Sequence, residues 1–198
     1  MNEIYPELEG NYEKKSFLDK IFASSVNRPQ YLIVHHVGGT DANPLLDTSN
    51  QSFETVNAYH KIAFDFKSSL GYYIGYHYYI SKNGILRQGR LDTDEGAHTL
   101  GYNNKSIGIC LAGNFDAKLP TPEQTSALKI LLEKKKSQYN IPSQNIVAHR
   151  MFANKTCFGR KLSDTWASSL VVDTNPNSSV KNELRSIIER LEKLEKII

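Results

Sequence analysis

The chain has 198 residues, of which 39% are hydrophobic and 23% charged, a composition typical of one globular domain with appendages. The formal net charge is +3, and no dense Lys/Arg stripe with interleaved aromatic residues accompanies it, so the sequence does not indicate a nucleic-acid-binding protein. No window approaches the roughly 18 consecutive apolar residues of a membrane span.

Residues 1–29 are polar with a weak helical pattern, and we interpret them as an N-terminal extension of a domain that spans residues 30–170. The first element of this domain is the apolar run that ends at His35, which predicts a buried strand. A long turn-rich loop follows. Ser52 then offers an N-cap for a helix whose apolar residues recur at helical spacing.

Two aromatic and β-branched runs, residues 72–80 and 85–90, are joined through Asn83-Gly84 and give the clearest hairpin signal in the chain. A further strand is expected at residues 107–112. It contains Cys110, which in an apolar run is typically a small buried side chain.

Thr121 and Gln124 form a capping box with proline in the first turn, which predicts a helix that ends before Ile141-Pro142. A last strand leads to His149. The order strand, helix, two strands, strand, helix, strand indicates an α/β domain with a mixed central sheet flanked by helices.

The stretch from Ile146 to Gly159 carries the strongest chemical signal. It reads as a strand ending in His149, followed by a short loop that brings Cys157 back to the same place. Imidazole and thiolate are good zinc ligands, and a third ligand with one open position makes such a site catalytic. His35 is the best candidate for that third ligand. A disulfide between Cys157 and Cys110, the only other cysteine, is poorly supported.

Four motifs in the same order, between about Tyr31 and Trp166, resemble the zinc-dependent N-acetylmuramoyl-L-alanine amidases of the T7 lysozyme and peptidoglycan-recognition-protein type (amidase type 2). They are residues 31–36; residues 74–80 with Asn83-Gly84 and Gly89-Arg90; residues 96–98 with residues 101–114; and residues 148–149 with residues 154–157.

This resemblance implies an amidase-like fold in which His35, His149 and Cys157 bind zinc. It also implies that Tyr76 and Lys155 stand beside the zinc-bound water and that His98 lies in the substrate groove. Many relatives have proline directly after the cysteine ligand, where this chain has Phe158. Members that only bind peptidoglycan commonly lack the cysteine, so its presence favours catalysis.

The implied chemistry suits these residue types. Three protein ligands leave one zinc position for water, whose pKa falls to about 7. Zinc and Lys155 would stabilise the tetrahedral oxyanion formed at the amide between N-acetylmuramic acid and L-alanine, while the Tyr76 hydroxyl orients water or substrate.

Each assignment has a structural alternative. A histidine at a strand end is usually a polar residue near the surface, a tyrosine in an aromatic strand normally packs in the core, and Lys155 by itself is an ordinary surface lysine. His36 is expected on the opposite strand face from His35. We interpret His60 and His77 as structural histidines satisfied by backbone carbonyls.

The C-terminal residues form a second unit. After a polar linker, residues 171–179, apolar residues repeat at spacings of 4, 3, 4, 3 and 4 between Val180 and Ile198. This heptad pattern predicts a coiled-coil helix over residues 180–198 that forms a homo-oligomer or docks onto a partner's helix. The alternative is that the helix folds back onto its own domain.

Three functions remain open at this point. The leading one is a zinc amidase that degrades bacterial cell wall, as phage endolysins do. The others are a non-catalytic peptidoglycan-binding module and a structural or regulatory component attached to a larger assembly through the coil. The first residues lack the features of a secretory signal, so we expect synthesis in the cytoplasm and action on the wall after release or delivery.

Overall fold

The computed structural model describes residues 26–171 and residues 184, 187 and 188. Most of the predicted N-terminal extension, the linker apart from Val171 and most of the predicted coil therefore lie outside the described residues. Leu184, Ile187 and Ile188 are helical and exposed. The coiled coil and the proposed domain boundaries stay predictions.

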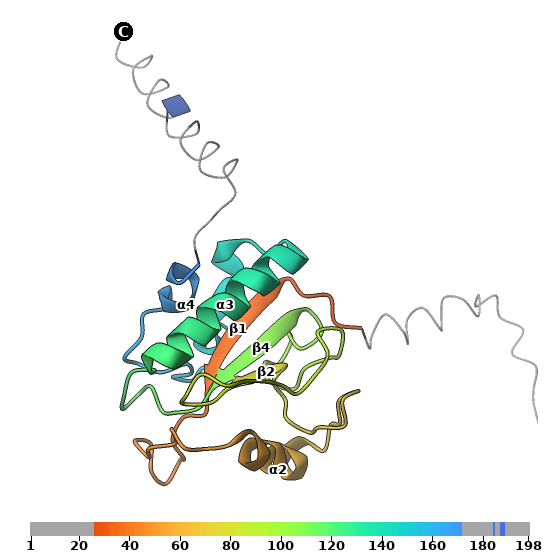
Figure 1. Ribbon diagram of the computed structural model, residues 1–198, viewed down its shortest axis with the longest axis vertical. Coiled ribbons are helices and arrows are strands. Elements are labelled where there is room, and N and C mark those ends of the chain that lie inside the picture. Colours follow the sequence, from red (N-terminus) through yellow and green to blue (C-terminus); the bar gives the residue numbers. More distant parts are fainter. Residues whose placement is uncertain (1–25, 172–183, 185–186, 189–198) are drawn as a thin grey trace, which may run out of the picture.

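A five-stranded mixed sheet forms the centre of the domain, in the strand order β3-β2-β4-β1-β5 (Figure 1). Four strands are parallel to their neighbours, namely β1 (Tyr31–His36), β2 (Tyr78–Ile80), β4 (Ser106–Leu111) and β5 (Ile146–Ala148). The edge strand β3 (Leu86–Gln88) pairs antiparallel with β2. The α/β class with a mixed central sheet is as the order of elements predicts.

The helices begin where their capping residues predict. Helix α2 (Phe53–Phe64) is capped by Ser52, whose hydroxyl accepts from the Thr55 amide, and α3 (Pro122–Tyr139) starts at the Thr121 capping box. The shorter helical elements are η1 (Ser143–Asn145), η2 (His149–Met151) and α4 (Trp166–Ser169). Within the described part of the chain, no helix has the length and apolarity needed to cross a membrane.

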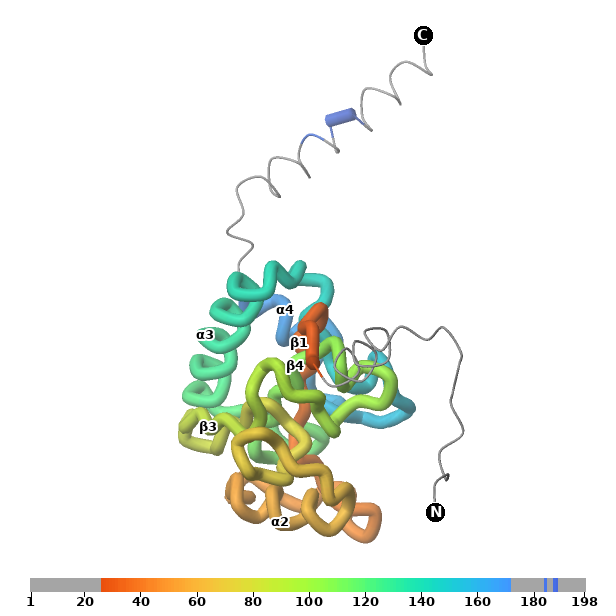
Figure 2. Tube along the Cα trace, turned by 90° about the vertical axis from the view of Figure 1, so that its right-hand side faces the viewer, coloured from red at the N-terminus to blue at the C-terminus, as the bar shows by residue number. Residues whose placement is uncertain are grey.

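Side-chain alternation divides the core between the two faces of the sheet. Leu32 and Val34 of β1 belong to the cluster that packs under α3 and α4, whereas the cluster on the other face contains Phe53 and Val56 of α2. Figures 1 and 2 show α3 alongside the sheet and α2 on a different side of it, toward the end where β1 leaves the sheet.

The predicted hairpin is present, but its first strand is shorter than the sequence suggests. Residues 72–77 are not in a strand, and only Tyr78–Ile80 pair with Leu86–Gln88. The reason is that polar side chains take the backbone amides of this segment: Asn57 Oδ1 accepts from Tyr73 and Ile74. Residues 72–77 are therefore held beside α2 and do not extend the strand.

Candidate metal centre

Parallel pairing brings two of the predicted ligands to the same edge of the sheet. Val34 of β1 is in register with Ala148 of β5, so the residues that follow them, His35 and His149, emerge side by side. Their ring centroids are 4.4 Å apart. His36 lies on the other face, where its Nδ1 accepts from the Phe115 amide.

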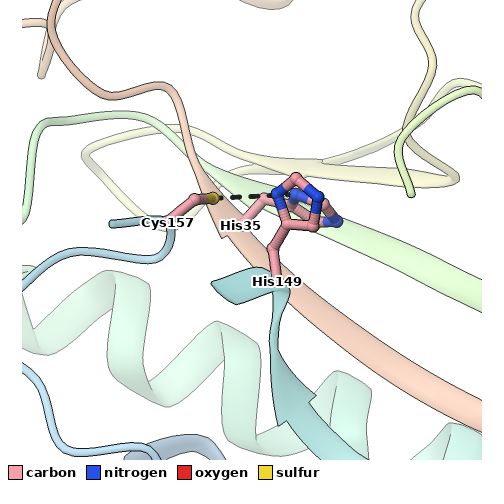
Figure 3. A group of neighbouring side chains, drawn as sticks. All are labelled: His35, His149 and Cys157. Carbon is pink, nitrogen blue, oxygen red and sulfur yellow. Dashed lines mark hydrogen bonds between the residues drawn. The ribbon is translucent and has the colours of Figure 1, made fainter. Parts of the chain in front are cut away.

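The loop after η2 returns Cys157 to these two histidines (Figure 3). Its Sγ lies 3.7 Å from His35 Nδ1, and one potential ligand atom from each of the three residues lies within 4.8 Å of the others. The three residues come from β1, η2 and the following loop, so only the folded chain assembles them.

The donor set and its spacing suit a zinc ion. Tetrahedral zinc with bonds of about 2.3 Å to sulfur and about 2.1 Å to nitrogen places these atoms about 3.6 Å apart. The separation of 3.7 Å between Cys157 Sγ and His35 Nδ1 is close to that value. Two imidazoles and one thiol leave the fourth coordination position to a small ligand or substrate.

Burial keeps the two candidate histidine ligands neutral. Burial, with the nearby His98 and His149, holds the pKa of His35 well below its usual value. Burial and the charge of Lys155 lower the pKa of His149 to about 4. At neutral pH both imidazoles therefore keep a lone pair available for a metal.

A neighbouring histidine orients His35. His98 Nδ1 lies 3.1 Å from His35 Nε2 and 2.9 Å from the Thr99 hydroxyl. A proton on His35 Nε2, shared with His98, leaves the Nδ1 lone pair facing Cys157. The His98 ring is closely packed, since a Cβ on Gly96 or Gly108 would lie 2.5 Å from its Cδ2.

Burial also controls the two weak acids of the centre. It raises the pKa of the Cys157 thiol to about 12, so a metal must displace the thiol proton in order to bind. Burial, with Cys110 and Cys157 nearby, raises the pKa of Tyr76 well above its usual value. The Tyr76 hydroxyl is therefore a hydrogen-bond donor at neutral pH, and its ring centroid lies 5.0 Å from that of His35.

All six predicted site residues border one cavity of about 620 Å³. The three candidate ligands line it together with Tyr76, the exposed Lys155 and the half-buried His98. Tyr76 and Lys155 thus line the same cavity as the three candidate ligands.

Several residues that line this cavity were not predicted from the sequence, among them Asp116, Tyr59 and Arg160. The position of Asp116 could have indicated it, because Asp116 closely follows β4 at the end of the sheet where His35 also lies. His60 also lines the cavity, and our interpretation of it was wrong in one respect. Its Nδ1 accepts from the Gly75 amide rather than donating to a carbonyl.

Known proteins are similar to this chain in sequence and in fold. The chain is 36% identical over 107 residues to an endolysin of Klebsiella phage KP32, which covers 52% of this chain and 70% of the phage protein. It is 31% identical over 150 residues to peptidoglycan-recognition protein SC2 of Drosophila melanogaster, with 73% and 78% of the two chains covered.

Solved structures agree at the level of the fold. The N-acetylmuramoyl-L-alanine amidase LysC from Clostridium intestinale superposes with a TM-score of 0.58 at 24% identity, over 83% of this chain and 88% of that one. Drosophila peptidoglycan recognition protein SD gives a TM-score of 0.56 at 26% identity, over 70% and 79%. A family model described as N-acetylmuramoyl-L-alanine amidase matches residues 25–160, and the chain belongs to that family.

Proposed function

We propose that this chain is a zinc-dependent N-acetylmuramoyl-L-alanine amidase that cleaves the amide between N-acetylmuramic acid and L-alanine in peptidoglycan. One observation carries the proposal: two neutral imidazoles and a thiol that line a cavity of about 620 Å³ have ligand atoms within 4.8 Å of one another. Membership of the amidase family supports it.

His35, His149 and Cys157 would hold the zinc ion. Bound there, zinc supplies a Lewis acid that lowers the pKa of water and polarises the substrate carbonyl. The chain's own contribution is to hold the ligands in place. His98 does so for His35 through the contact of 3.1 Å between their ring nitrogens.

Tyr76 and Lys155 are the proposed catalytic side chains. The Tyr76 hydroxyl keeps its proton at neutral pH, so it donates a hydrogen bond to water or to the substrate. Lys155 lines the same cavity from the loop beside Cys157, where its ammonium stabilises negative charge that develops on the carbonyl oxygen. His98 contributes to the wall against which we propose that the substrate lies.

A non-catalytic peptidoglycan-binding module is the second candidate. The relative that covers 73% of this chain is a recognition protein by name. This alternative predicts binding to peptidoglycan without zinc and without peptide release. The presence of Cys157 favours the amidase, because recognition alone needs no thiol ligand.

We also propose that residues 180–198 form a homo-oligomeric coiled coil or dock onto a partner helix. Leu184 and Ile187 occupy the predicted heptad positions, and their exposed fractions are 56% and 46%. Deleting residues 180–198 should abolish assembly and leave cleavage of small substrates intact. We further propose that the enzyme reaches the cell wall after release or delivery.

The deciding experiment measures zinc content and stem-peptide release from purified peptidoglycan. The wild type is compared with Cys157→Ser and with Lys129→Ala, a control that removes an exposed helix ion pair to Glu133. We expect one zinc per chain and peptide release in the wild type and the control, and neither in Cys157→Ser. Peptidoglycan binding without zinc or release would favour the recognition module.

A further inference from the structure

The position of Cys157 depends on an irregular segment, residues 156–162, which we name the Cys157 loop. This segment contains no strand or helix, so no regular backbone ladder fixes the sulfur. His35 and His149, in contrast, lie at or next to paired strands. Individual contacts with the Cys157 loop, rather than a strand ladder, therefore hold the thiol in place.

Arg150 makes such contacts from one side. Its guanidinium donates to the carbonyls of Gly159 and Leu162 at 2.6 and 2.7 Å. Its backbone amide also donates to the Cys157 carbonyl at 2.6 Å, a bond that does not depend on the side chain. The remaining guanidinium nitrogen, Nε, pairs with Asp164 at 2.5 Å. Because Arg150 directly follows His149, one residue joins the second candidate ligand to the loop of the third.

Asp116 contacts the Cys157 loop from another side. Its Oδ2 accepts from the Thr156 hydroxyl at 2.7 Å, and its Oδ1 accepts from the Arg160 amide at 2.8 Å. These two bonds reach the chain on either side of Cys157. The side chain of Asp116 is only 12% exposed, so water competes little for its oxygens.

We propose that Arg150 and Asp116 are positioning residues that hold Cys157 in its metal-binding place before a metal arrives. The inference deepens the proposed function and rests on it. Because the loop is ordered before the metal binds, the free energy of metal binding is not reduced by the conformational entropy lost in ordering the loop. Partners of this kind typically change metal affinity by about 10- to 100-fold.

A merely structural role for these residues makes a different prediction. In that case their loss lowers the melting temperature, while the folded variants bind zinc as tightly as the wild type. Zinc affinity and the chemical accessibility of Cys157 therefore discriminate between the two roles, whereas stability alone does not.

The test uses the full chain after removal of zinc with a chelator. The zinc dissociation constant is measured by chelator competition for the wild type, Arg150→Ala, Arg150→Lys, Asp116→Asn and the control Arg87→Ala. Arg87 also pairs with a carboxylate, that of Glu54, but does not line the cavity. The rate at which a thiol reagent modifies Cys157 is measured without zinc, with Cys157→Ser as the blank for the buried Cys110.

We expect Arg150→Ala and Asp116→Asn to weaken zinc binding about 10- to 100-fold and to accelerate thiol modification severalfold. Arg150→Lys should lie between them and the wild type, because one ammonium cannot reproduce the guanidinium fork. The control should match the wild type. Variants that fold and show wild-type zinc affinity and thiol reactivity, whatever their melting temperatures, would overturn the inference.

Two further outcomes keep the proposals separate. If the wild type itself binds no zinc, the proposed metal centre fails, and the thiol rates alone decide whether Arg150 and Asp116 place Cys157. If Arg150→Ala does not fold, Arg150→Lys and Asp116→Asn decide the question by the same two measurements.

Discussion

Two of the groups of buried polar side chains in this domain differ in how their hydrogen-bonding groups are used. In the first, which we call the closed cluster, Asp92 pairs with Lys135 and accepts from the hydroxyls of Tyr78 and Tyr139 at 2.7 and 2.8 Å. Burial raises the pKa of Asp92, but the bonds from Lys135 and the tyrosines lower it by more, so the carboxylate stays ionised.

The second cluster, which we call the open cluster, is formed by His35, His149 and Cys157 and holds no such complementary charge. Burial keeps its imidazoles neutral and its thiol protonated, and all three residues line the cavity. The closed cluster joins α3 to the segment after β3, and its charges are paired within the protein. The difference teaches that buried polar side chains indicate a metal-binding site only where their lone pairs remain available.

The largest expected effect comes from breaking the closed cluster. Lys135→Ala leaves the Asp92 carboxylate buried without its cation, which should cost about 3–5 kcal/mol of unfolding free energy. Chemical denaturation of the metal-free protein measures this loss. His35→Ala is the matched comparison, and we expect it to cost much less, because no charged partner is left behind. Equal losses in the two variants would contradict the comparison.

Substitutions in the cavity beside the open cluster should change the reaction rate rather than the stability of the fold. Tyr76→Phe removes one hydroxyl donor from the cavity, and Lys155→Met removes the ammonium while keeping a similar length. Each should lower the rate of stem-peptide release about 100-fold, with zinc content unchanged. The exposed lysine variant Lys129→Ala provides the control. A full rate in Tyr76→Phe would remove the hydroxyl from the mechanism.

The sequence predicts the elements of this fold well because its signals are local. Ser52, the Thr121 capping box and Asn83-Gly84 act within a few residues, and the structure confirms the helices and the turn that they indicate. The strand predicted from residue 72 is too long because Asn57 and His60, distant in the sequence, take its backbone amides. Such contacts leave no periodic pattern.

The candidate site is predictable only in part, for the same reason. His35, His149 and Cys157 stand out by residue type, and the ends of parallel strands bring the two histidines together. Asp116 and Arg150 look like ordinary charged residues in the sequence. Their contacts with the Cys157 loop appear only when the chain is folded.

Zinc itself offers a sharper test of the open cluster. A ligand that binds only the folded state at roughly 100 times its dissociation constant stabilises that state by about 2.7 kcal/mol. Zinc should therefore raise the melting temperature of the wild type and leave that of Cys157→Ser unchanged. Lys135→Ala should show the same zinc-dependent increase as the wild type, from a lower starting temperature. An equal increase in Cys157→Ser would place zinc elsewhere.

The smallest expected effect is the pH dependence of stability that comes from His77, a buried histidine whose two ring nitrogens both have hydrogen-bond partners. Its Nδ1 accepts from the Gly108 amide at 3.0 Å, and its Nε2 lies 2.9 Å from the Asp94 carbonyl. Burial lowers the pKa of His77 to about 4, and protonating Nδ1 would set it against the Gly108 donor.

The sign of the pH effect follows from this shift. Between pH 6.5 and 4 the unfolded chain binds the His77 proton and the folded chain does not, so stability falls as the pH falls. His77 alone should contribute on the order of 2 kcal/mol between pH 7 and pH 5. Urea denaturation of the metal-free wild type and of His77→Gln at both pH values isolates this term, because the other histidines titrate in both proteins. His77→Gln should be less stable at pH 7 but lose less on acidification. The same loss in both would mean that His77 is protonated in the folded state as easily as in the unfolded chain, and that its two bonds do not hold it neutral.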